Sequence, residues 1–191
     1  MNTIISKGNM KLGKIPNISL PPILSCDNKV ECAKSCYALK AFRLYPSAKK
    51  AWLNNLDLYN SDPNKYFGDI DGYLLKSKPA FFRFHQAGDI LNQDYLNRMK
   101  VLCRKHKNVK FLCFTKKYNL DFRYKSSNLE IVFSAWPGRN IPKSKFRIAW
   151  LDNGEDNRIP KSAIECPGHC DVCGMCWNLS KLNKDVKFKI H

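Results

Sequence analysis

Seven of the nine cysteines in this 191-residue chain lie in two short windows, and this clustering constrains its fold and chemistry more than any other feature. The window at residues 26–36 has the spacing C-x5-C-x3-C, and the window at residues 166–176 has the spacing C-x3-C-x2-C-x2-C. Closely spaced thiolates can converge on one metal centre, and they suit zinc, copper(I) or iron–sulfur clusters. An odd number of cysteines, after a start that lacks the apolar run of a signal peptide, argues against a disulfide framework. We therefore expect cysteine-rich metal-binding loops near both ends of the chain.

The first group has three cysteines, one fewer than a closed four-iron cluster requires. Three thiolates would leave one iron of a 4Fe-4S cluster open to water, substrate or cofactor, as an open position separates catalytic from structural metal sites. A closed cluster, a zinc site completed by a histidine, and a centre shared by both groups are the alternatives. The predicted cofactor-binding residues are Cys26, Cys32 and Cys36.

The second group is denser and adds four predicted metal ligands: Cys166, Cys170, Cys173 and Cys176. Its two-residue spacings match the ligand run of bacterial ferredoxins, and they equally match half of a zinc knuckle. Gly168 and Gly174 give the backbone freedom to wrap around a metal. The spacing therefore predicts a second cluster or a zinc ion without deciding between them.

Strands alternate with helices in the middle of the chain, which is typical of an α/β fold with a parallel sheet. A nearly continuous apolar run at 109–114 is typical of a buried parallel strand, and residues 81–85, 129–133 and 146–151 also predict strands. Shorter strands are expected near 18–20, 163–165 and 185–191. An eight-fold barrel needs about 250 residues. We expect a single domain over 1–191, built as a partial barrel or an open, mostly parallel sheet with flanking helices.

Apolar stripes and capping residues predict the helices. Ser47 and Asp62 are expected to cap two helices, with Pro63 in the first turn of the second. A further stripe at 95–103 predicts a third helix. Cys103 in that stripe and Cys113 in the apolar run are expected to be core residues, because an unligated cysteine packs as a small hydrophobe.

Polar residues follow the predicted strands, and in parallel α/β folds ligands bind at the carboxyl ends of strands. The predicted catalytic residues are His85, Asp89 and Lys116. An imidazole can move a proton and a carboxylate can orient it, so His85 and Asp89 form the preferred pair. Lys116 could hold an acidic substrate group. The structural alternatives are a hydrogen-bonded histidine, a turn or capping aspartate, and a solvated lysine.

The net charge is +17, from 33 basic and 16 acidic residues. Such a charge attracts nucleic acids, anionic membranes and acidic small molecules. The basic residues are scattered, and no apolar run reaches the length of about 18 that a membrane span needs. The expected partner is a small molecule, with nucleic acid as a further possibility.

Several segments resemble the gene product 88-like family of phage and viral proteins: residues 8–14, 19–21, 32–38, 82–89, 114–116 and 173–177. The resemblance covers most of the chain and implies a viral iron–sulfur protein, distantly related to the radical-SAM barrel enzymes. Those enzymes usually carry C-x3-C-x2-C. Here Cys32 and Cys36 keep the first interval, but the third cysteine, Cys26, precedes them. This departure counts against S-adenosylmethionine as a cofactor.

These observations favour an iron–sulfur protein whose open iron binds or transforms a small thiol, another sulfur compound or a hydroxy acid. The expected location is the cytoplasm, which would be the host's for a viral protein. A metal-stapled basic protein that binds nucleic acid, and a redox or sensor protein without turnover, are the alternatives.

Overall fold

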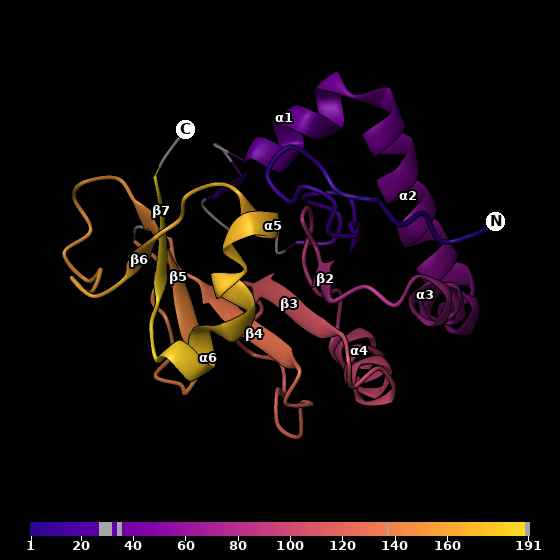
Figure 1. Ribbon diagram of the computed structural model, residues 1–191. Helices are drawn as coiled ribbons and strands as arrows, with labels where there is room; N and C mark the ends of the chain where they lie inside the picture. The colour runs from indigo at the N-terminus through magenta and orange to yellow at the C-terminus, as the bar shows by residue number, and fades with distance from the viewer. Residues whose placement is uncertain (27–31, 34–35, 137, 190–191) are drawn as a thin grey trace.

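Seven parallel strands form one open sheet in the part of the chain that the structure describes (Figure 1). The structure is a computed structural model that describes residues 1–26, 32–33, 36–136 and 138–189. The strands are β1 (Asn17–Ile18), β2 (Phe81–Phe84), β3 (Lys110–Thr115), β4 (Leu129–Ser134), β5 (Arg147–Asp152), β6 (Ile164–Glu165) and β7 (Val186–Lys189). The helices are α1 (Tyr37–Leu44), α2 (Pro46–Ser61), α3 (Pro63–Ser77), α4 (Gln93–Lys105), α5 (Cys170–Cys173), the 3-10 helix η2 (Met175–Asn178) and α6 (Leu179–Leu182). The expected α/β class with an open parallel sheet is confirmed.

The strand order is β1-β2-β3-β4-β5-β7-β6, so the first five strands follow one another across the sheet. All neighbouring strands pair in parallel. Right-handed crossovers in one direction place the connecting helices on the same face of such a sheet. The progressive order therefore leaves the other face to be covered by a different part of the chain.

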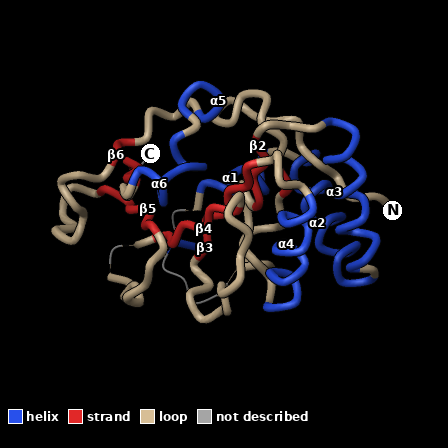
Figure 2. The backbone as a smooth tube through the Cα atoms, turned by 60° about the horizontal axis from the view of Figure 1, so that its bottom comes forward, coloured by secondary structure: helices blue, strands red, loops and turns tan. Residues whose placement is uncertain are grey.

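Alternate residues of the central strands enter two separate cores. Phe111 and Cys113 of β3 pack with α2, α3 and α4, whereas Leu112 packs with Trp177 and Leu179 from η2 and α6. Strand side chains alternate between the two faces, and a parallel sheet buried on both faces reads as a continuous apolar run. We call the two sides the α2–α4 face and the α5–α6 face. Figures 1 and 2 show α5 and α6 on one side of the strands and α2–α4 gathered beyond β2.

The C-terminal segment is fixed to the α5–α6 face by specific contacts as well as by packing. The Trp177 indole donates a hydrogen bond to the backbone oxygen of Phe82 at 3.2 Å, and its ring lies 5.1 Å from that of Phe81. The backbone amide of Ser180 donates to the buried Glu130 carboxylate at 3.0 Å. The second cysteine group is thereby held against the sheet.

Two of the local predictions need correction. Ser47 does not cap α2: the helix begins one residue earlier, at Pro46, and Tyr45 stands at the capping position without a side-chain hydrogen bond. Proline suits the first helical turn because it lacks the amide hydrogen that would be unpaired there. The second expected loop is largely helical, since α5 and η2 carry three of its four cysteines. Asp62 does cap α3 and accepts a hydrogen bond from the Lys65 amide at 2.9 Å.

The described helices include none that is both long and apolar enough to cross a bilayer. Residues 190–191 of the last predicted strand lie outside the described residues.

Candidate metal centres and the polar edge of the sheet

The three cysteines of the first group lie close enough for their charges to interact. Cys26 follows β1, and Cys36 directly precedes α1. Burial raises the pKa of the Cys26 thiol to about 11, and the charges of Asp89 and Cys32 add to the rise. Burial also raises the pKa of Cys32, against the opposing charge of Lys116, while Cys36 adds to the rise. Metal binding at such a group must displace protons from the thiols.

A close contact between two backbone segments fixes the position of Cys26. The Leu20 amide donates to the Ala87 oxygen at 3.0 Å, and the Asp89 amide donates to the Ser25 hydroxyl at 3.2 Å. Gly88 permits this approach, because a Cβ there would lie 2.4 Å from Ser25 Oγ and the residue has a φ of +80°. A side chain at position 88 would therefore push the first cysteine group away from the end of β2.

The Asp89 carboxylate joins the loop after β2 to the end of β3. Its Oδ1 accepts from the Thr115 hydroxyl at 2.6 Å and from the Ile90 amide at 2.7 Å, and its Oδ2 accepts from the Lys116 amide at 2.9 Å. Burial raises the pKa of Asp89, and these hydrogen bonds oppose the rise. The carboxylate is thus a structural acceptor that holds the loop beside Cys26.

Two cations stand on the other side of the first cysteine group. The Lys116 ammonium lies 5.8 Å from the centre of the Trp136 ring, and the Arg139 guanidinium lies 5.2 Å from that of Tyr118. Both charges act to lower the pKa of Cys32. The predicted site residue Lys116 therefore lies next to the predicted ligands, where a positive charge favours a thiolate or an anionic ligand.

The structure does not join His85 and Asp89 as a hydrogen-bonded pair in the described part of the chain. His85 has a φ of +57°, which turns its ring into the core of the α2–α4 face. Its Nε2 lies 3.1 Å from the Tyr95 hydroxyl and its Nδ1 lies 3.7 Å from the Cys113 sulfur. These contacts favour a packing role, and a catalytic role for His85 stays a prediction.

All four cysteines of the second group line one hollow, together with His169, Gly174 and Trp177. Cys166 follows β6, and its amide continues the ladder to the Lys187 oxygen at 2.9 Å. The Cys170 amide donates to the Lys11 oxygen at 2.8 Å. Gly174, with a φ of +58°, ends α5 and turns the chain into η2. Short helices and two turns thus bring side chains from an eleven-residue window to one place.

The two groups form separate sites connected by one residue that the sequence reading did not single out. Cys166, Cys170 and Cys173 raise the pKa of Cys176, in each case after the larger effect of burial. Arg83 of β2 acts in the opposite sense on Cys170 and Cys176. It also acts on Tyr37, whose pKa is raised by burial of its hydroxyl and by the nearby charges of Cys36 and Cys26. A single arginine within an aromatic strand was the available signal.

No three Cys, His, Asp or Glu side chains of the described residues form a ready-made site for a single metal ion. A four-iron cluster binds each thiolate through a different iron, so its ligands stand further apart than those of one zinc ion.

The model of one protein family, described as gene product 88, matches residues 2–179. The chain belongs to the gene product 88 family. The match includes both cysteine groups and ends before β7. No curated protein and no solved structure matches the chain.

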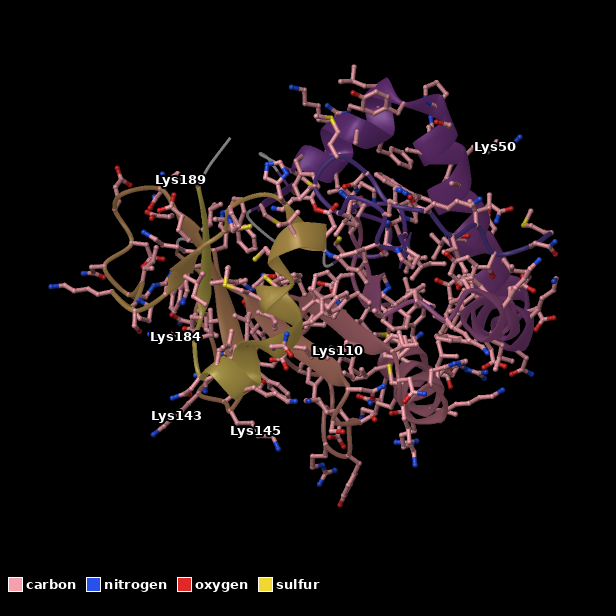
Figure 3. The ribbon with its side chains drawn as sticks, viewed as in Figure 1. Lys50, Lys110, Lys143, Lys145, Lys184 and Lys189 are labelled. Carbon is pink, nitrogen blue, oxygen red and sulfur yellow. The ribbon has the colours of Figure 1, made fainter. Side chains whose placement is uncertain are left out.

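The basic charge of this member of the gene product 88 family is spread over the molecule. Figure 3 shows Lys50 on α2, far from Lys143, Lys145 and Lys184 at the end where β5 begins and β7 follows α6. Nucleic-acid readers usually gather basic residues on one face. The labelled lysines do not single out such a face.

The buried imidazole predicts a pH dependence of stability for this gene product 88 protein. Burial, with a smaller effect of the Arg83 charge, lowers the pKa of His85 to about 3 from its ordinary value of 6.5. Between these values the unfolded chain takes up a proton that the folded chain does not. The free energy of unfolding should therefore fall by about 1.4 kcal/mol for each pH unit below about 6.

Urea denaturation at pH 7, 6, 5 and 4.5 measures this loss in the wild type and in His85→Asn. Asparagine tolerates a positive φ but does not titrate, so the variant should lack this part of the slope. Equal slopes in the two proteins would show that His85 is not the group responsible.

Proposed function

We propose that this chain is an iron–sulfur protein whose first cysteine group holds a cluster with one iron open to a small-molecule ligand. The proposed ligands are Cys26, Cys32 and Cys36. The observation that carries the proposal is the meeting of three thiols, and no fourth, beside the carboxyl ends of β2 and β3. Ligands of parallel α/β proteins bind at this edge.

The donor chemistry of both groups fits iron and sulfide. Thiolates are soft ligands, and each group is assembled from side chains whose charges already interact. We assign the second group to a closed four-thiolate site, a second cluster or zinc, because four cysteines line its hollow. The absence of a ready-made single-ion site among the described residues means that the thiols must close in as the metal binds, which is common for metal sites.

An open iron supplies Lewis-acid chemistry and favours soft or anionic ligands. The chain's own residues would position the ligand. Lys116 places a positive charge beside Cys32, and Trp136 offers an aromatic face next to that charge. Asp89 holds the Lys116 backbone in place through its hydrogen bond. The proposed substrate is a small thiol, another sulfur compound or a hydroxy acid.

Metal and sulfide analysis of anaerobically purified protein, with electron paramagnetic resonance in both redox states, tests this proposal. We expect about four iron and four sulfide for each cluster. The resonance of the reduced protein should change when a thiol or a hydroxy acid is added. S-adenosylmethionine serves as a third ligand in the same titration.

Three outcomes lead elsewhere. Zinc without sulfide would overturn the iron–sulfur proposal. Iron whose spectrum responds to none of the three ligands would favour a redox or sensor protein without turnover. A zinc protein whose binding to DNA or RNA weakens steeply with salt would favour the nucleic-acid alternative.

A further inference from the structure

Arg83 lies in the middle of β2 with an incomplete set of partners. Phe82 and Phe84 enter the core of the α2–α4 face, so Arg83 points to the α5–α6 face. Its guanidinium lies 4.9 Å from the centre of the Phe114 ring. Its Nε is fully buried and has no hydrogen-bond partner in the described structure. A buried charged donor without an acceptor is costly, and native proteins rarely keep one without a reason.

The surroundings of Arg83 contain no acid that would explain it. The ion pairs in the described part of the chain include none with Arg83. Aromatic rings and thiols surround it instead. Stacking on Phe114 holds the plane of the guanidinium but satisfies no N–H group. The edge that carries Nε therefore still needs an oxygen acceptor.

The position of Arg83 relates it to both cysteine groups. It lies near Cys170 and Cys176 on one side, and near the Tyr37 hydroxyl on the other. Tyr37 directly follows Cys36 and donates its hydroxyl proton to the Gln86 oxygen. A ligand bound to an open iron at the first group could thus extend one end toward Arg83.

We propose that Arg83 binds the carboxylate of the small molecule that occupies the first cysteine group. The fork of a guanidinium, formed by Nε and one terminal nitrogen, matches the two oxygens of a carboxylate. A phosphate would require further donors around its third oxygen. This inference rests on the proposed function and narrows its substrate class to carboxylic acids, such as a mercapto acid or a hydroxy acid.

Two thiols that differ in the carboxylate test the proposal. 3-Mercaptopropionate carries both groups, whereas 2-mercaptoethanol carries the thiol with a neutral hydroxyl. Titration of anaerobically purified full-length protein, followed by electron paramagnetic resonance and by calorimetry, gives the affinity for each. We expect the mercapto acid to bind roughly 10- to 100-fold more tightly, the range for a charge-assisted bidentate pair.

Arg83→Met should abolish this preference and leave the affinity for 2-mercaptoethanol unchanged. Arg83→Lys keeps the charge without the fork, so it should keep only part of the preference. Arg43→Met, which removes an exposed arginine from α1, is the matched control and should behave as the wild type. Arg83→Lys also serves if Arg83→Met does not fold.

The outcomes separate the two proposals. If both thiols perturb the cluster equally in wild type and in Arg83→Met, the open site stands and the role of Arg83 is wrong. If Arg83→Met changes the iron content or the midpoint potential but not the preference, Arg83 is a counter-charge for a cluster, which also overturns the inference. Tighter binding of inorganic phosphate than of 3-mercaptopropionate would replace the carboxylate by a phosphate. If the protein holds no iron, the proposed function itself fails, and calorimetry with the two thiols still shows whether Arg83 binds a carboxylate.

Discussion

Replacing Cys32 by alanine is expected to remove about four iron and four sulfide atoms from each chain and to abolish the response of the cluster to added ligands. Cys32 is the middle ligand of the proposed open site, and its thiol interacts with Cys26, Cys36 and Lys116. Two thiolates would remain, which is too few to hold a four-iron cluster against loss to solvent. Iron and sulfide analysis, together with the visible spectrum of anaerobically purified protein, measures the loss.

Two matched variants give this experiment its controls. Cys170→Ala should remove only the metal of the second group, because the two groups form separate sites in the structure. Cys103→Ala shortens a fully buried cysteine in α4 and should leave the metal content unchanged. Full iron in Cys32→Ala would remove the first group from the proposal. Loss of all metal from Cys32→Ala and equally from Cys170→Ala would indicate one centre shared by both groups.

Asp89→Ala is expected to destabilise the protein by about 3–5 kcal/mol, which would be a large share of the stability of a domain of this size. The buried carboxylate accepts hydrogen bonds from the Thr115 hydroxyl and from two backbone amides. Alanine would leave all three donors unsatisfied away from water. Urea denaturation at pH 7 measures the change.

Asp89→Asn and Asp57→Ala separate this mechanism from a general effect of removing charge. Asparagine keeps one acceptor oxygen in the same place, so its cost should lie between those of wild type and alanine. Asp57 is exposed on α2, and its replacement should change the free energy of unfolding by no more than about 0.5 kcal/mol. A cost for Asp89→Ala as small as that for Asp57→Ala would refute the role given to the carboxylate.

Much of the sheet could be predicted from local patterns. The apolar run that became β3 and the stripe that became α4 each report their environment within a dozen residues, because burial on both faces or on one face leaves a distinct periodicity. The helix α1 was not predicted, since its eight residues follow the first cysteine group directly and begin without a capping side chain. The short helices of the second group were missed for the same reason.

The candidate site shows where such patterns fail. Strand alternation alone would put His85 on the same face as Phe81 and Arg83. The positive φ at His85 reverses its direction and buries the ring beside Tyr95. Asp89 was chosen as a partner for His85, yet it accepts hydrogen bonds from the end of β3, a strand formed more than twenty residues later. Sequence spacing does not contain these contacts, because they depend on how β2 and β3 pair.

The sequence by itself determined that this is a parallel α/β protein and that seven cysteines form two groups, since periodicity and spacing are local properties of the chain. Only the tertiary structure decided that the C-terminal helices cover the face opposite α2–α4, and that Arg83 lies between the two groups. The physical reason is that parallel pairing and packing bring together residues such as Tyr37, Arg83 and Cys170 that are far apart along the chain.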